Sequence, residues 1–200
     1  MQSYQEAFIK FALDRGALSF GDFTLKSGRQ SAYFFNAGVF NTGKDLQKLG
    51  RFYADAIERA NLTYDALFGP AYKGIPLVTA TAISLAEKGK NVPYAFNRKE
   101  TKDHGEGGHI IGANLANKKV LIIDDVITAG TAVRETINFL DAAKTNLCGV
   151  IVALDRQERG QTTSSATEEI AAHYQVPVTS IVNITDLIEY AEKYKPNNTR

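Results

Sequence analysis

The chain has 200 residues, 44% of them hydrophobic and 22% charged, so it is long enough to bury a full core as one domain over 1–200. Lysine and arginine total 23 against 22 acidic residues, a balance that provides no general basic field for nucleic acid and no acidic tail. The one cysteine, Cys148, lies in an apolar stretch as a small core residue, which indicates no disulfide and a reducing, cytoplasmic setting.

The N-terminal segment has the pattern of an amphipathic helix, which excludes a signal peptide and a membrane span. Short strands around Leu18–Leu25 and Ser31–Asn36 follow, and then a helix over about Gly43–Asn61. We expect about residues 1–40, together with the C-terminal segment, to form a hood. The apolar positions of the first helix recur at helical spacing, at Tyr4, Phe8, Phe11 and Ala12.

From residue 65 onward, strands alternate with helices, which predicts an α/β fold with a central, mainly parallel sheet flanked by helices. Ser165 and Glu168 resemble a capping box at the start of one helix. In chain order, the expected elements are a strand after Asp65, a helix to about Lys88, a strand near Val92–Phe96, a strand over Val120–Asp124, a helix over Ala132–Leu140, a strand over Leu147–Leu154, a helix to near Gln175, a strand over Val178–Val182 and a helix from Thr185.

Residues 65–76, DALFGPAYKGIP, join a short apolar strand to a helix through a tight turn that carries Tyr72 and Lys73. The helix is expected to begin at residue 75 or 76, because proline favours the first helical position. Free N–H groups around Lys73 and Gly74 predict an anion site, with pyrophosphate as its candidate ligand. Seen in isolation, the turn is also an ordinary strand-to-helix connection.

Residues 97–108, NRKETKDHGEGG, contain no apolar side chain and end in glycines, so we expect a mobile surface loop. Closure of such a loop would exclude water from an activated sugar. A solvated hairpin tip has the same composition, so the loop alone does not identify a site. Its side chains that suit a pyrophosphate are Arg98, Lys99, Lys102 and His104.

Val120–Ala132, VLIIDDVITAGTA, is the most specific segment of the chain. Its unbroken apolar run predicts a strand buried on both faces, which places Asp124 and Asp125 at the carboxyl end, where open α/β sheets bind ligands. The turn Thr128–Thr131 then opens a helix, so backbone N–H groups and two hydroxyls converge on a phosphate site.

The two adjacent carboxylates would repel a phosphate unless they bind something else. Ionised carboxylates accept hydrogen bonds, so Asp124 and Asp125 suit the 2- and 3-hydroxyls of a pentose, and they also attract Mg²⁺ through water. The segment therefore predicts a site for a phosphorylated pentose. A solvated pair of aspartates beside a helix cap explains each residue separately but does not explain the whole pattern.

Val120–Ala132 resembles the motif by which type I phosphoribosyltransferases bind 5-phosphoribosyl 1-pyrophosphate (PRPP). Four further segments extend the resemblance over essentially the whole chain, to the bacterial type of orotate phosphoribosyltransferases: FTLKSGRQSAYFFN, FGPAYKGIPL, RKETKDHGEGG and ALDRQERG. The resemblance implies the type I phosphoribosyltransferase fold with an N-terminal hood and a flexible catalytic loop. It also implies transfer of the 5-phosphoribosyl group from PRPP to orotate, giving orotidine 5-phosphate and pyrophosphate in UMP biosynthesis.

The same resemblance implies a role for each matching residue. The implied orotate contacts are Lys26, Phe34, Phe35, Thr128 and Arg156. The implied PRPP contacts are Lys26, Tyr72, Lys73, Arg98, Lys99, Lys102, His104, Asp124, Asp125, Val126, Ile127, Thr128, Ala129, Gly130, Thr131 and Ala132. The implied catalytic residues are Lys73, Arg98, Lys99, Asp124, Asp125, Lys102 and His104, of which the last two are candidate acids for the leaving group.

The cofactor implied is Mg²⁺, held by PRPP and not directly by the protein, with Asp124 and Asp125 as the residues that would reach it through water. The partner implied is a second copy of the chain, in a homodimer whose catalytic loops reach into the neighbouring site. No nucleic acid, membrane or structural metal is expected. The three histidines lack a zinc-ligand spacing with other soft ligands: His104, His109 and His173.

Two alternatives remain open from the sequence. The first is another type I transferase, acting on a purine or on uracil, which would keep the PRPP motif but need a different hood. The second is a regulator that senses PRPP and binds nucleic acid on the same fold. The near-neutral charge and the full set of loop cations weigh against that regulator.

Overall fold

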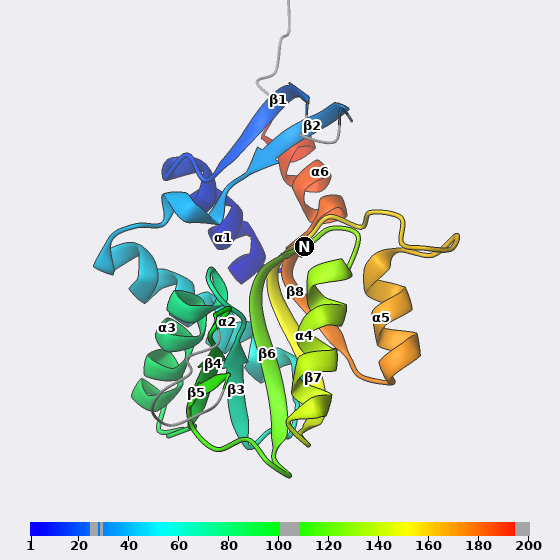
Figure 1. Cartoon of the computed structure of the whole chain (residues 1–200). Coiled ribbons are helices and arrows are strands. Elements are labelled where there is room, and N and C mark those ends of the chain that lie inside the picture. The colour runs from blue at the N-terminus through cyan, green and yellow to red at the C-terminus, as the bar shows by residue number, and fades with distance from the viewer. Residues whose placement is uncertain (25–27, 29, 101–108, 195–200) are drawn as a thin grey trace, which may run out of the picture.

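The centre of the molecule is a six-stranded sheet in the order β5-β4-β3-β6-β7-β8 (Figure 1). The computed structural model describes residues 1–24, 28, 30–100 and 109–194. All neighbouring strands run parallel except β5, which pairs antiparallel with β4. The strands are β3 (Ala66–Gly69), β4 (Tyr94–Asn97), β5 (Ile110–Gly112), β6 (Lys119–Ile127), β7 (Asn146–Asp155) and β8 (Val178–Asn183). The predicted fold class is confirmed.

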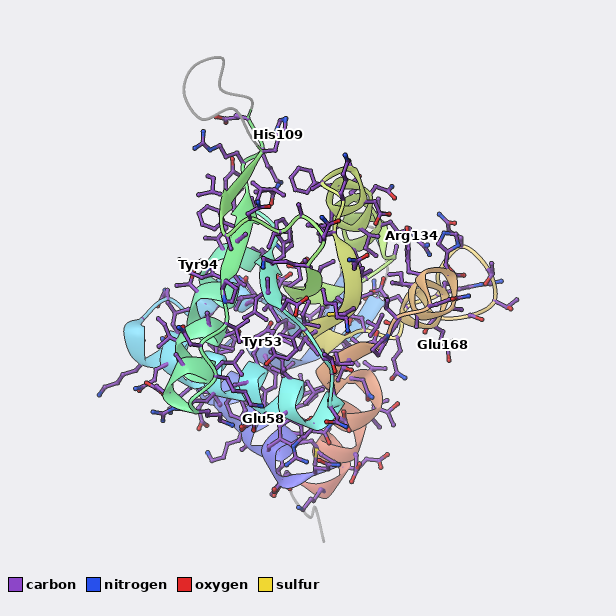
Figure 2. The ribbon with its side chains drawn as sticks, turned by 90° about the horizontal axis from the view of Figure 1, so that it is seen from below. Tyr53, Glu58, Tyr94, His109, Arg134 and Glu168 are labelled. Atoms are coloured by element: carbon purple, nitrogen blue, oxygen red, sulfur yellow. The ribbon has the colours of Figure 1, made fainter. Side chains whose placement is uncertain are left out.

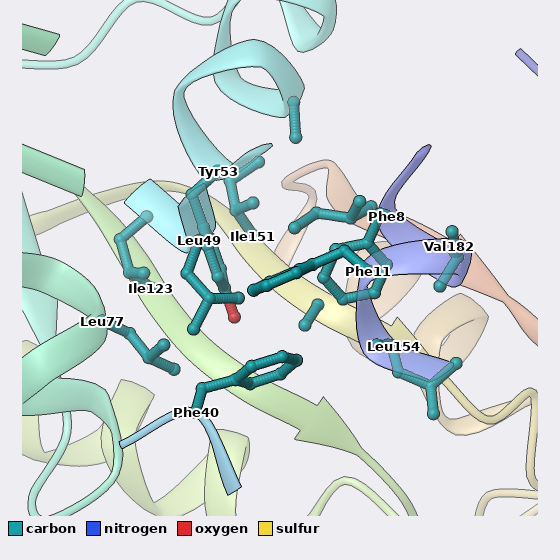
Figure 3. Close-up of a cluster of buried hydrophobic side chains, with 14 of the residues drawn as sticks. Phe8, Phe11, Phe40, Leu49, Tyr53, Leu77, Ile123, Ile151, Leu154 and Val182 are labelled. Atoms are coloured by element: carbon teal, nitrogen blue, oxygen red, sulfur yellow. The ribbon is translucent and has the colours of Figure 1, made fainter. Parts of the chain in front are cut away.

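Helices cover both faces of this sheet. α1 (Ser3–Asp14), α2 (Gly43–Ala60), α3 (Gly74–Glu87) and α6 (Ile184–Lys193) pack into one apolar cluster, whereas α4 (Thr131–Ala142) and α5 (Ala166–Tyr174) pack into a second. Along β6 the side chains alternate: Leu121 and Ile123 join the first cluster, and Val120 and Ile122 join the second. A strand with two buried faces has no polar side to present, which explains the unbroken apolar run in the sequence. Figure 3 shows part of the first cluster, where α1 and α2 meet β6 and β7.

Polar side chains define where several helices begin. Reciprocal capping boxes join Thr42 with Asp45 at α2 and Ser165 with Glu168 at α5, so the predicted cap of α5 is confirmed. A third box, with Asn183 as the cap, starts α6 at Ile184, one residue before the predicted Thr185. No helix in the described ranges is both long enough and apolar enough to cross a lipid bilayer.

A separate hairpin lies beyond the carboxyl edge of the sheet, near α6 (Figure 1). It consists of β1 (Leu18–Thr24) and β2 (Gln30–Phe35), and a short 3-10 helix η1 (Ala37–Val39) leads from it toward α2. Tyr33 is buried and Phe35 packs on the first cluster, so β2 is tied to the core on one face. The hairpin therefore stands over the edge at which β6 and β7 end.

Besides α6, α3 begins earlier than expected, at Gly74 and not at residue 75 or 76. The strands differ from the sequence-based expectation at three further places. β5 was not expected, because three residues, IIG, form too short a run to signal a strand. Asn97, expected as the first residue of the loop, is the last residue of β4 and pairs with Ile110. β6 continues to Ile127, since Val126 and Ile127 pair with the end of β7, so the strand runs past the expected end at Asp124.

Candidate active site

The two adjacent aspartates lie near the end of β6, within the paired part of the strand. Asp124 Oδ1 accepts a 2.9 Å hydrogen bond from the backbone N–H of Asp125, and Asp125 Oδ1 accepts one of the same length from Val126. Burial, and then the nearby charge of Asp125, raise the pKa of the Asp124 carboxyl to about 7. The pair is thus fixed by its own backbone, and one member gains a proton near neutral pH.

The turn after β6 leaves the start of α4 open. Thr128 and Ala129 are exposed, and Gly130 adopts a left-handed conformation with φ 83° as the N-cap of the helix. Among the residues that the structure places, no side chain caps the first turn, so its N–H groups remain available to an anion. A Cβ atom on Gly130 would meet Ile170 Cδ1 of α5 at 3.0 Å, so glycine also allows the close approach of α5.

A second loop approaches the aspartates from the end of β3. The ammonium group of Lys73 lies 3.1 Å from Asp125 Oδ2, and the side chain of Asp125 is only 13% exposed. Gly74 donates its backbone N–H to the carbonyl of Pro70. The prediction that this N–H group is free is therefore wrong. The N–H groups of Tyr72 and Lys73 have no acceptor among the residues that the structure places, so they are the ones open to an anion.

A cavity of about 670 Å³ joins these parts. The loop after β3 forms one wall, the carboxylates of β6 lie in the middle, and α4 forms the other wall. Lys99 also lines the cavity, and its ammonium group lies 5.3 Å from the centre of the Tyr72 ring. Arg98 is half-buried beside it. Two of the predicted loop residues, Lys102 and His104, lie outside the described residues.

Four residues of α4 reach this cavity, of which only the first was predicted from the sequence. Relative to the first, the others stand three, four and seven residues further along the helix, which brings them onto one face. Extending the helical period from the end of the motif would have found them, but nothing in the pattern alone says that this face borders a cavity. The four residues are Ala132, Glu135, Thr136 and Phe139.

The predicted orotate contacts do not all lie together. Phe34 and Phe35 are successive residues of β2, so their side chains point to opposite faces: Phe34 is 45% exposed, whereas Phe35 packs on the core. One flat ligand can therefore contact only one of the two rings. Lys26 lies outside the described residues, and Thr128 is exposed on the turn after β6.

Arg156 follows β7 on the same edge of the sheet, as predicted. Its backbone N–H donates to the carbonyl of Ile127, and its guanidinium lies 5.0 Å from the centre of the Tyr33 ring. Its Nε atom lies 2.7 Å from Glu158 Oε1. Arg156 lines a different cavity, of about 580 Å³, between the hairpin and α6. In this conformation its charge is already paired within the loop.

Glu169 of α5 connects the loop that carries Arg156 to α4. The carboxylate of Glu169 accepts hydrogen bonds from the backbone N–H groups of Gln161 and Thr162 and forms a 3.1 Å ion pair with Arg134. Figure 2 shows Arg134 between α4 and α5. This carboxylate therefore links the loop after β7 to the helix whose first turn is open to an anion.

Comparison with known proteins agrees with this geometry. A family model described as the phosphoribosyl transferase domain matches residues 39–179. A curated relative, the orotate phosphoribosyltransferase of Nitrosococcus oceani, is 58% identical over 96% of this chain and 88% of its own length. This chain belongs to the orotate phosphoribosyltransferase family.

Two further orotate phosphoribosyltransferases support the same conclusion. The protein of Hahella chejuensis is 60% identical over 95% of this chain and 88% of its own length. The crystal structure of the enzyme of Francisella tularensis has a TM-score of 0.87 and 47% identity, and the match covers 96% of this chain and 92% of that one. The resemblance inferred from the motifs is confirmed, and the relatives named here are neither purine transferases nor regulators.

Proposed function

We propose that this chain transfers the 5-phosphoribosyl group of PRPP to a ring nitrogen of orotate, with inversion at the anomeric carbon, giving orotidine 5-phosphate and pyrophosphate. The observation that carries the proposal is the single cavity lined both by Asp124 and Asp125 and by Tyr72 and Lys73. A diol-binding carboxylate pair and a separate anion loop match the two ends of one PRPP molecule. Family membership selects orotate as the acceptor.

In this proposal the sugar end of PRPP lies along β6 and α4. Ionised Asp124 and Asp125 accept hydrogen bonds from the ribose 2- and 3-hydroxyls. The segment from Val126 to Ala132 surrounds the 5-phosphate, which the open N-terminus of α4 attracts. The carboxylates also favour the positive charge that develops on the ribose in the transition state.

The pyrophosphate end lies against the loop after β3 and the cationic loop that follows β4. Lys73 must exchange its ion pair with Asp125 for the pyrophosphate, because its ammonium group lies 3.1 Å from that carboxylate in the cavity. Together with Arg98, Lys99 and Lys102, it neutralises the leaving group. Lys102 and His104 are the candidates that protonate it.

The donor set fits Mg²⁺ held mainly by the substrate. Two adjacent carboxylates face the cavity, and the described part of the chain contains no group of three or more His, Cys, Asp or Glu residues placed to hold a metal. Mg²⁺ favours oxygen ligands and keeps several waters, so Asp124 and Asp125 would hold it through water while PRPP supplies the other oxygens. When bound, the ion stabilises negative charge on the departing pyrophosphate.

The acceptor lies between the hairpin and the end of β6. The proposed orotate contacts are Lys26, Thr128, Arg156 and the pair Phe34 and Phe35, of which one contributes its ring and the other its backbone. For a carboxylate of orotate to bind Arg156, the guanidinium must share or exchange its contact with Glu158. The ring nitrogen of orotate is already acidic, so no strong general base is required.

Three further features belong to the proposal. The chain acts as one domain over 1–200, with about residues 1–40 and the C-terminal segment as a hood. It works as a homodimer, because the family's loop residues serve the neighbouring site. It resides in the cytoplasm, consistent with its single cysteine, which packs half-buried against the core and not in a disulfide.

A substrate panel tests the reaction. The purified chain, given PRPP and Mg²⁺, is expected to consume orotate at ordinary enzyme rates and to leave hypoxanthine, adenine and uracil unchanged, as followed by the absorbance of each base. Asp125→Asn serves as the control, since it removes one of the diol-binding carboxylates without changing the size of the side chain. Turnover of any other base in preference to orotate, or orotate loss that does not require PRPP, would contradict the proposal.

A further inference from the structure

Asn97 ties the end of β4 to the loop after β3. The last paired residues of these two strands are Gly69 and Phe96, and Asn97 is the next residue of β4. Its side-chain Oδ1 accepts a 2.7 Å hydrogen bond from the backbone N–H of Ala71. The bond therefore forms where the ladder of the sheet ends and the loop begins. Ala71 lies directly before Tyr72 and Lys73, which line the cavity and whose N–H groups have no acceptor among the described residues.

The loop has few other constraints on its path. Gly74 donates to the carbonyl of Pro70 at 2.9 Å, and Ile75 donates to that of Tyr72 at 3.2 Å, so these two backbone bonds close the loop onto the first turn of α3. Among the described residues, Asn97 is the one side chain that hydrogen-bonds to the backbone of the loop between Pro70 and Lys73. Without that bond, the N–H group of Ala71, at a half-buried position, would lose its only acceptor among the described residues.

The chain folds back on itself tightly at this point. A Cβ atom on Gly69 would lie 2.3 Å from the carbonyl oxygen of Gly74, and one on Gly74 would lie 2.6 Å from Pro70 Cδ. Two glycines thus allow the turn, but they do not specify its direction, because glycine adopts many backbone conformations. A side-chain acceptor at a fixed place on the sheet supplies that direction.

We propose that Asn97 is a positioning residue for the pyrophosphate of PRPP. By holding Ala71, it aims the N–H groups of Tyr72 and Lys73 into the cavity and keeps the Lys73 ammonium group beside Asp125. Asn97 itself lines the same cavity and directly precedes Arg98 and Lys99, so one side chain sets the relation between both anion-binding segments. The inference rests on the proposed function for its choice of ligand.

The test measures two ligands that occupy opposite ends of the cavity. Titration calorimetry with Mg²⁺ gives the dissociation constants of pyrophosphate and of ribose 5-phosphate for wild type and for Asn97→Ala. We expect the pyrophosphate constant to rise about five- to tenfold, the scale of one lost hydrogen bond, and the ribose 5-phosphate constant to stay within about twofold. A loss of general structure would weaken both ligands.

A matched control is Asn114→Ala. Asn114 Oδ1 likewise accepts from a backbone N–H, that of Ala116 at 3.0 Å, but in an exposed turn that does not line the cavity. We expect both ligands to bind this variant as they bind wild type. If Asn97→Ala fails to fold, Asn97→Gln replaces it, because the longer side chain keeps the amide but moves its oxygen; the same selective loss is expected.

Lys73→Ala separates this inference from the proposed function. If Lys73→Ala weakens pyrophosphate binding but both Asn97 variants leave it unchanged, the positioning role is wrong while the proposed function stands. Equal weakening of both ligands by the Asn97 variants also overturns the positioning role. If neither Lys73→Ala nor the Asn97 variants affect pyrophosphate, the assignment of that loop in the proposed function is wrong as well.

Discussion

The hydroxyl of Tyr53 donates a 2.7 Å hydrogen bond to the backbone carbonyl of Asp124. Tyr53 belongs to α2 and is fully buried, so this bond reaches from the apolar core to the residue that carries one of the proposed diol-binding carboxylates. Figure 3 shows the phenol among apolar side chains with its oxygen toward the sheet, and Figure 2 shows its place inside the molecule. Burial, together with the charges of Asp125 and Asp124, raises the pKa of the phenol well above its usual value, so it remains a donor.

Removal of the Tyr53 hydroxyl is expected to change both the stability of the chain and its kinetics with PRPP. Tyr53→Phe leaves the Asp124 carbonyl without its buried partner, which we expect to lower the free energy of unfolding by about 1–3 kcal/mol and to raise the KM for PRPP severalfold. Denaturant unfolding and initial-rate kinetics provide the two measurements. Tyr64→Phe is the control, because Tyr64 is half-buried before β3, at the opposite edge of the sheet. Equal effects of both substitutions on KM would exclude a specific link between Tyr53 and the site.

The pKa of Asp124 predicts a dependence of stability on pH. In the folded chain this pKa is raised to about 7, whereas the pKa of an aspartate in the unfolded chain is about 4. Between these values the folded state binds more protons than the unfolded state, so this group's contribution makes the free energy of unfolding decrease as pH rises from about 4 through about 7. Asp124→Asn removes the contribution. We expect wild type to lose stability relative to Asp124→Asn between pH 5 and pH 8 in urea unfolding; a difference that stays constant across that range would show that the carboxyl titrates elsewhere.

At Gly50, where α2 packs closely on α3, we predict that no side chain is tolerated. A Cβ atom on Gly50 would lie 2.3 Å from the carbonyl oxygen of Ala80 and 2.6 Å from Ser84 Oγ. Gly50→Ala therefore forces two backbones apart and is expected to cost about 1–3 kcal/mol, visible as a lower Tm. Gly43→Ala is the control, since nothing lies within 4 Å of its added Cβ and alanine favours a helix. The prediction is wrong if both variants melt at the wild-type temperature.

The proposed sharing of loops between subunits predicts complementation. Lys102→Ala and Asp125→Asn are each expected to lower kcat at least about a hundredfold as homodimers. In a mixed dimer, one of the two sites receives a native Asp125 from one subunit and a native Lys102 from the other. Equal mixing with free exchange of subunits should therefore restore about a quarter of wild-type activity. Complete lack of recovery, once exchange has been demonstrated by mass spectrometry, would mean that each site is self-contained.

The sequence by itself determined the elements whose signals are local. The apolar run before Asp124, the turn ending at Gly130 and the capping box at Ser165 each depend on neighbouring residues, and the structure contains all three. Side-chain periodicity and turn chemistry act over a few residues, so they can be recognised in a single chain. The motif at the end of β6 also carried the family, which the relatives confirm.

Only the tertiary structure decided which distant residues share the cavity. The extension of β6 to Ile127 depends on pairing with β7, the place of Asn97 depends on Ala71, and the role of Tyr53 depends on α2 packing beneath the sheet. Each of these contacts joins residues far apart in the chain, and each forms only because burial of both sheet faces brings the elements together. A local sequence pattern does not depend on that packing. The roles of Tyr53 and Asn97 could therefore be found only from their contacts in the structure.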